Sequence, residues 1–163
     1  MNRLLKFSLI ALIILALPLL AGAQSADQSY THTIGADGNA MVTGMSGNAT
    51  ELVIPSQLGG RPVTTIGENA FKDFRDVVSV EIPEGVAGIG KGAFRDSISL
   101  KSVTLPSTLR TIGENAFSGC SSLEKVVLPE GITEIADNAF FRCINLEEVT
   151  FPKSLRSIGK LAF

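Results

Sequence analysis

A period of 23 residues runs through most of this chain. The pair Ala-Phe occurs five times, and consecutive Phe residues of these pairs are always 23 positions apart. The five residues are Phe71, Phe94, Phe117, Phe140 and Phe163. Columns of Ile, Pro, Val and Leu recur in the same register. Since periods of about 20–50 residues are typical of solenoids and other repeat arrays, this feature constrains the fold more than any other.

The order of residues within one copy predicts its local structure. Val126-x-Leu128 alternates with period two, which is typical of a strand with one buried side. Pro129 follows and ends the strand, because it has no N–H group for the hydrogen-bond ladder. From there to Phe140 the apolar residues are spaced by three or four, which suits a short helical or irregular return.

One such unit is too small to bury its apolar side chains, but stacked copies bury them against each other. We therefore expect an α/β repeat fold: a solenoid with a parallel β-sheet on one face and short helical or irregular returns. The five Phe residues of the Ala-Phe pairs should form an internal ladder. A buried ring of this kind contributes about 1.5–3 kcal/mol.

The repeat resembles a known family. The pattern Leu-x-x-Val-x-Leu-Pro, followed by Ile-Gly-Glu-Asn-Ala-Phe-Ser-Gly-Cys at Ile112 to Cys120, is similar to the 23-residue leucine-rich repeat of the BspA-like, or Treponema pallidum-type, surface proteins. The similarity covers Ala49 to Phe163. Between Pro55 and Ile66 the first repeat carries an insertion. The resemblance implies a non-enzymatic module that adheres to host-matrix proteins or to other cells.

The N-terminus has the pattern of a secretory signal peptide, residues 1–23. Arg3 and Lys6 precede an apolar run of 14 residues, and Ala21-Gly22-Ala23 forms a small-residue cleavage site. A transmembrane helix would need about 18–20 apolar residues. We expect cleavage after Ala23, no stable membrane span afterwards, and a secreted or cell-surface protein. It is not a lipoprotein, because Ala23 stands where a lipid-anchored Cys would be required.

Residues 24–50 precede the repeats, which we place at 51–163. Apolar and β-branched residues at 30–34 and 40–43 flank Asp37-Gly38, a frequent hairpin turn. We expect an N-terminal β-hairpin cap that covers the first coil, since the end of a solenoid otherwise exposes its core. A linker is the alternative.

At the other end, the sequence stops at Phe163, within the fifth repeat and on a residue of the Phe ladder. No polar cap follows. Because solenoids require capped ends, we expect a fragment of a longer array in preference to an end that another molecule covers.

Composition offers little chemistry. The chain has 1 His and 2 Cys, too few for a multi-histidine or four-cysteine metal site. With 14 basic and 16 acidic residues it lacks the charge of a nucleic-acid binder. His32 is a candidate base for a hydrolase, but Gly-x-Ser-x-Gly is absent. We therefore expect no enzymatic activity, no metal and no cofactor.

Cys120 and Cys143 occupy the same position in consecutive repeats. Adjacent coils would bring their Cα atoms to about 4.8 Å, which a disulfide tolerates, and an exported protein permits the bond. Side chains stacked in parallel fit the required dihedral angle poorly, and Cys packs well as a small apolar residue. We favour two buried thiols and keep the disulfide as the alternative.

The outward positions of the expected strands are the candidate protein-binding face, because repeat proteins present such a surface to partners. These positions are mixed, small and polar, without Arg or aromatic residues. They are Glu51, Val53, Ser79, Glu81, Ser102, Thr104, Lys125, Val127, Glu148 and Thr150. A role as structural spacer, with a binding or anchoring domain beyond residue 163, is the alternative function.

Overall fold

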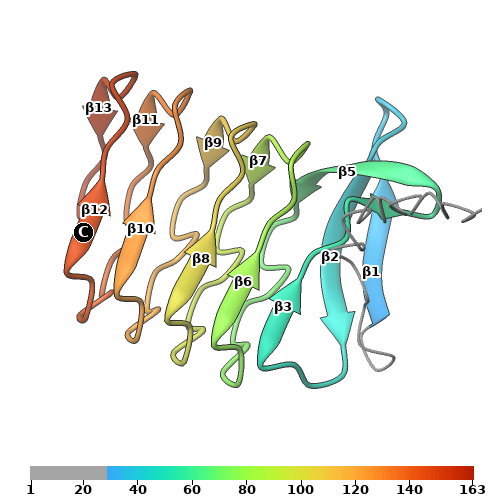
Figure 1. The fold of residues 1–163 in the computed structure, drawn as a ribbon, viewed down its shortest axis with the longest axis horizontal. Coiled ribbons are helices and arrows are strands. Elements are labelled where there is room, and N and C mark those ends of the chain that lie inside the picture. The colour runs from blue at the N-terminus through green and yellow to red at the C-terminus, as the bar shows by residue number, and fades with distance from the viewer. Residues whose placement is uncertain (1–28) are drawn as a thin grey trace, which may run out of the picture.

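The computed structural model describes residues 29–163, so the predicted signal peptide lies outside the described residues. Five coils stack into an elongated solenoid (Figure 1). We number the repeats by the Phe at which each ends: repeat 1 covers residues 51–71, repeat 2 covers 72–94, repeat 3 covers 95–117, repeat 4 covers 118–140 and repeat 5 covers 141–163.

One long side of the solenoid is a five-stranded parallel sheet, to which each repeat contributes one three-residue strand. The strand order is β12-β10-β8-β6-β3. The strands are β3 (Glu51–Val53), β6 (Ser79–Glu81), β8 (Ser102–Thr104), β10 (Lys125–Val127) and β12 (Glu148–Thr150). In each strand the central residue points into the solenoid and the two flanking residues point outward, as period-two alternation requires. The outward side of this sheet is called the strand face below.

The return segments contain a second set of strands, where the sequence predicted one sheet only. Strand β5 (Arg61–Ile66) pairs in parallel with β7 (Gly88–Ile89), and β7 with β9 (Thr111–Ile112). A separate two-stranded sheet joins β11 (Glu134–Ile135) to β13 (Ser157–Ile158). The insertion in repeat 1 forms β4 (Gln57–Leu58), antiparallel to β5.

The short helices expected as one form of the returns are absent from residues 29–163, which contain strands and turns. The reason lies in the backbone on both sides of the Phe ladder. Asn115 and Asn138 have φ values of 58° and 56°, and Asp96 and Arg142 have 61° and 60°. A left-handed residue terminates an α-helix. Two of them within one return therefore leave no room for a helical turn, and the spacing of three to four reflects consecutive tight turns.

The core is built around the Phe ladder. Rings of adjacent repeats stack with centroids 5.2–5.4 Å apart and planes within 13° of parallel. Phe71 and Phe117 are fully buried, whereas Phe163 at the last coil is 46% exposed. The Ile, Val and Leu columns line the same interior. Each coil thus presents the same apolar cross-section to the next.

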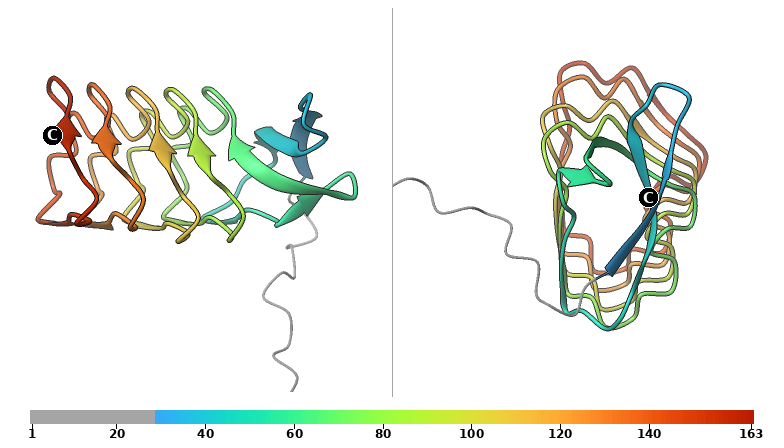
Figure 2. Two further views of the ribbon diagram at one scale, coloured as in Figure 1. Left: turned by 90° about the horizontal axis from the view of Figure 1, so that it is seen from above. Right: turned by 90° about the vertical axis from the view of Figure 1, so that its right-hand side faces the viewer.

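Before the repeats, β1 (Ser29–Ile34) and β2 (Ala40–Ser46) form an antiparallel hairpin, and β2 continues the second sheet by pairing in parallel with β5. Seen along the solenoid, the hairpin lies across the first coil (Figure 2). The Tyr30 ring packs edge-on against Phe71 at 6.4 Å, and its hydroxyl donates to the Val53 carbonyl at 2.7 Å. These contacts support the predicted cap; its boundary at residue 50 stays a prediction.

Candidate functional site

The ten candidate residues form two rows across the strand face. Parallel pairing places the first residues of the strands in one row and the third residues in another. All three residues of each strand are paired between β3 and β6, between β6 and β8, and between β10 and β12. Between β8 and β10 only Ser102 and Lys125 pair. All ten side chains are exposed except Ser79, which is half-buried.

Charge on the strand face is predominantly negative. Three of the ten residues are Glu and one is Lys, and the Lys125 ammonium lies 2.7 Å from the Glu148 carboxylate. Both side chains are about half exposed to water. An exposed pair of this kind contributes about 0–1 kcal/mol, so its main effect is to hold the two long side chains against the sheet.

A groove of about 430 Å³ lies between β8 and β10. Its walls include Val103, Leu105, Val127 and Pro129, and Thr104 and Ser107 supply hydroxyls. Val127 is 52% exposed. Apart from the exposed Val53 in β3, this groove is the apolar part of a mostly polar face.

Sequence reasoning missed that Leu105 and Phe151 expose apolar surface beside the strand face. Both follow directly after a strand, in the column where Ile82 and Leu128 are buried, yet Leu105 is half-buried and Phe151 is 47% exposed. The Phe151 ring packs edge-on against Phe163 at 5.8 Å. Only the change from Leu to Phe in this column could have drawn attention to residue 151.

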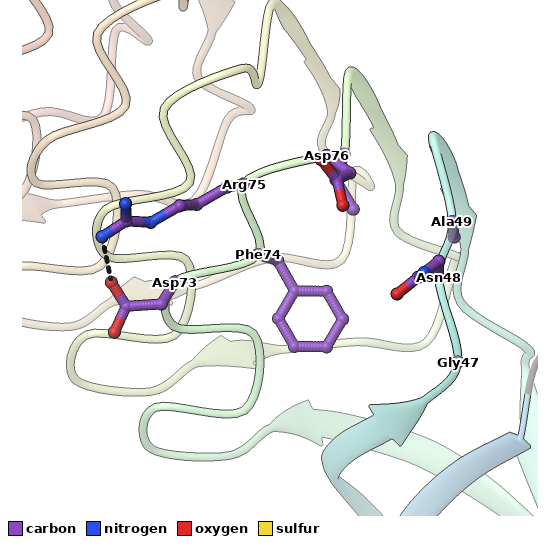
Figure 3. Close-up of a pocket in the computed structure, with 8 residues that line it drawn as sticks. Gly47, Asn48, Ala49, Asp73, Phe74, Arg75 and Asp76 are labelled. Atoms are coloured by element: carbon purple, nitrogen blue, oxygen red, sulfur yellow. Dashed lines mark ion pairs between the residues drawn. The ribbon is translucent and has the colours of Figure 1, made fainter.

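A second depression of about 260 Å³ lies where the hairpin meets the repeats (Figure 3). Residues 47–49 form one wall and residues 73–77 form the other. The Phe74 ring reaches between them and packs edge-on against Phe71 at 5.5 Å. At the rim, Arg75 and Asp73 form an ion pair at 3.8 Å. The depression is small and its polar groups do not converge on one point.

His32 lies half-buried in β1 and packs against Gly59 in the turn between β4 and β5. Its imidazole Nε2 is 2.8 Å from the position that a Cβ on Gly59 would occupy. Across residues 29–163, no three His, Cys, Asp or Glu side chains gather as a metal site.

Both cysteines are free thiols that point inward. The Cys120 Sγ donates to the Phe94 carbonyl at 3.2 Å, and the Cys143 Sγ donates to the Phe117 carbonyl at 3.1 Å. Ser97 occupies the same column in repeat 3 and makes the equivalent bond to the Phe71 carbonyl at 3.1 Å. The column therefore bridges coils through side-chain donors, and each thiol contacts the backbone carbonyl of a ladder Phe that lies 26 residues before it.

Alkaline pH should destabilise the folded chain through these thiols. Burial raises the pKa of both from the ordinary 9.0, that of Cys143 to about 12, so the folded protein retains protons that the unfolded chain loses above pH 9. The contribution of the thiols to the free energy of unfolding is therefore fully present below pH 9. It decreases as the pH rises from 9 toward the pKa of the folded state. Between pH 8 and pH 10 we expect a loss of about 1 kcal/mol per thiol, measured by urea unfolding.

The control for this prediction is Cys143→Ser, because Ser97 shows that the column accepts a hydroxyl. This variant should lose about half of the pH dependence between pH 8 and pH 10. Unfolding free energies that stay constant across this interval in the unmodified chain would contradict the assignment.

The comparison with known sequences decides the family. The profile of the BspA type Leucine rich repeat region matches residues 45–163 in six copies. The chain belongs to this family. The resemblance read from the sequence is thereby confirmed.

Solved structures agree with the assignment to the BspA-type family. A leucine rich cell surface protein from Faecalibacterium prausnitzii is 32% identical, with a TM-score of 0.66 over 87% of this chain and 47% of its own. A leucine-rich repeat protein from Bacteroides ovatus is 27% identical, with a TM-score of 0.63 over 84% and 43%. The T. pallidum Leucine Rich Repeat protein is 25% identical, with a TM-score of 0.57 over 80% and 83%.

This BspA-type chain thus spans less than half the length of the F. prausnitzii and B. ovatus structures. No curated protein gives a significant match. A helix long and apolar enough to span a membrane does not occur within residues 29–163.

Proposed function

We propose that this chain is an exported, non-enzymatic protein-binding module that presents its strand face to host-matrix or cell-surface proteins. The observation that carries the proposal is the strand face itself: two rows of outward side chains on a parallel sheet, with a groove between β8 and β10. Repeat proteins bind partners through surfaces of this kind. The similarity to a protein described as a cell surface protein supports the location.

The size of the strand face limits its affinity. Five strands spaced by about 4.8 Å span roughly 20 Å, whereas a standard interface covers about 800 Å² per partner. Large anchors such as Trp and Arg, which dominate strong interfaces, are absent from the ten positions. One copy should therefore bind weakly, and useful adhesion would depend on many copies at a surface or on a longer array.

Charge reversal on the strand face tests the proposal. We expect the combined variant Glu81→Lys, Thr104→Glu and Lys125→Glu, which reverses two charges and adds a third, to weaken binding to immobilised matrix proteins by about tenfold or more, because it disrupts charge complementarity with the partner. Surface plasmon resonance with a panel of purified matrix proteins would measure this effect.

The matched control is Glu134→Lys in β11, which is exposed on another side of the solenoid. It should bind as the unmodified chain does. If binding survives all three strand-face substitutions together, the strand face is not the site.

A second candidate function is that of a structural spacer in a larger surface protein. The observation that favours it is that the chain spans less than half of two similar structures. In that case the binding or anchoring domain would lie outside residues 29–163, and no matrix protein or cell would be bound by this chain alone.

A further inference from the structure

The hydrogen bonds between repeats 3 and 4 are incomplete. In the strand-face sheet, β6 and β8 pair through three residues, as do β10 and β12, whereas β8 and β10 pair through one. The amide after the strand donates to the next repeat from Ile82 to Thr104 at 3.1 Å and from Leu128 to Thr150 at 3.0 Å. Within the described residues, the corresponding bond from Leu105 to Val127 is missing.

The same interruption occurs in the second sheet. Strands β7 and β9 pair, and β11 and β13 pair, but β9 and β11 do not. Arg110 donates its amide to the Ala87 carbonyl at 2.9 Å, and Gly113 donates to Ile89 at 2.8 Å. The equivalent donors one repeat later are Thr133 and Ala136, and neither makes such a bond in the described chain. Figure 1 shows β10 and β11 set apart from β8 and β9.

On the side of the Phe ladder the two repeats remain joined. Asn115 donates to Asp137 at 3.1 Å and Phe117 donates to Ala139 at 2.8 Å, as in the other repeats. The ring of Phe117 lies 5.3 Å from that of Phe140, the ordinary spacing of the ladder. The separation is therefore confined to the arc that includes the two sheets.

The cause is the methyl group of Ala136. The other repeats carry Gly at this position, where the backbones of consecutive coils touch. A Cβ on Gly90 would lie 2.8 Å from the Glu68 nitrogen, and a Cβ on Gly113 would lie 2.7 Å from the Lys91 nitrogen. Such distances are well below van der Waals contact between carbon and nitrogen. Ala136 has this atom, so repeat 4 cannot approach repeat 3 at the normal spacing.

In other repeats a Glu carboxylate, called the clamp below, accepts hydrogen bonds from the next repeat. This clamp is missing between repeats 3 and 4. The Glu84 carboxylate accepts hydrogen bonds from the amide and hydroxyl of Ser107 at 2.9 and 3.0 Å. Glu130 likewise accepts from the amides of Lys153 and Ser154 at 3.0 and 3.3 Å. In repeat 3 the clamp position is Ser107, so no carboxylate reaches repeat 4 from there.

The Arg110 guanidinium fills the space instead, donating to the carbonyls of Ser107 and Leu109 at 2.9 Å. Its Nη1 lies 2.8 Å from the position of a Cβ on Gly131. The Arg110 side chain of repeat 3 thus lies over the backbone of repeat 4. In other repeats, backbone hydrogen bonds and the Glu clamp join the coils at this place.

We propose that the junction of repeats 3 and 4 is a hinge built into the solenoid. The Ala136 methyl group holds the sheets of the two repeats apart, the Phe ladder acts as the axis, and the two parts of the solenoid bend against each other about it. Opening of this hinge widens the groove between β8 and β10, and closing narrows it.

Amide hydrogen exchange on the full chain, followed residue by residue by NMR, tests the hinge. In the unmodified chain the amides of Leu105, Thr133 and Ala136 should exchange about tenfold or more faster than those of Ile82, Arg110 and Gly113, their bonded equivalents. In Ala136→Gly the coils can approach, and exchange at Leu105 and Thr133 should slow by about tenfold.

The direction of this change distinguishes the hinge from a general effect on stability. An Ala-to-Gly change usually loosens the backbone, and would then speed exchange. Unchanged or faster exchange at Leu105 and Thr133 in Ala136→Gly overturns the proposal, as does equal protection of the two sets of amides in the unmodified chain.

The matched control is Gly113→Ala, which places a methyl group between repeats 2 and 3. It should speed exchange at Ile82 and Arg110 and leave Leu128 unchanged. If this variant does not fold, Ala136→Gly still decides the question, because it removes atoms and adds no strain. Folded Gly113→Ala with unaltered exchange at Ile82 would show that the methyl group does not separate coils, and would also overturn the proposal.

Discussion

Replacing Phe117 by Ala is expected to lower the free energy of unfolding by about 3–5 kcal/mol. The side chain is fully buried, and its ring stacks between those of Phe94 and Phe140 at 5.2 and 5.3 Å. Deletion removes apolar contacts on both sides and leaves a cavity in the middle of the ladder, which the neighbouring coils can fill only by moving. In a solenoid each repeat is stabilised mainly by its neighbours, so the loss affects repeats 2 and 4 as well. Urea unfolding followed by circular dichroism would measure it.

Phe141→Ala is the matched control, because this Phe is half-buried and lies outside the ladder. Its ring lies 5.3 Å from the Arg142 guanidinium, a cation–π contact worth about 0.5–1 kcal/mol at an exposed site. The control should therefore cost less than about 1 kcal/mol. Equal losses for Phe117→Ala and Phe141→Ala would show that the ladder is not the main source of stability.

Introducing a carboxylate with Leu100→Asp should cost more than about 4 kcal/mol, enough to abolish cooperative folding of a domain of ordinary stability. Leu100 is fully buried in the hydrophobic core, where an ionised carboxylate loses its hydration. Size-exclusion chromatography and thermal unfolding by circular dichroism would show the loss. Because burial raises the pKa of a carboxyl group, the defect should lessen as pH falls and the group becomes protonated.

The neighbouring change Lys101→Asp is the control for this experiment. Lys101 is exposed, and its backbone amide donates to the Val78 carbonyl independently of the side chain. We expect a change within about 0.5 kcal/mol. A similar collapse of both variants would mean that the segment tolerates no negative charge, and the alternation of buried and exposed positions would not explain the result.

The sequence predicted the repeat, the inward and outward alternation of the strands and the Phe ladder. It did so because each of these features depends on local spacing: a period of two along a strand and a period of 23 along the chain. The hairpin before the repeats was predicted in the same way, from Asp37-Gly38 between two β-type segments.

The sequence left the form of the returns open, helical or irregular, where spacing was ambiguous. Apolar residues three or four apart fit a helix and also fit a series of tight turns. Asn138 and Arg142 have left-handed backbone, with φ values of 56° and 60°, and this segment therefore forms turns and not a helix. The second sheet was missed for a related reason, since a two-residue strand such as β11 has no periodicity of its own.

The sequence by itself determined that coils of 23 residues stack, which residues face the interior and which ten face outward. Tertiary structure decided how closely each pair of coils approaches. That distance depends on contacts between residues 23 positions apart, such as Gly113 against the Lys91 backbone. The substitution of Ala136 into this Gly column is visible in the sequence, but a single methyl group has a consequence only where two backbones meet.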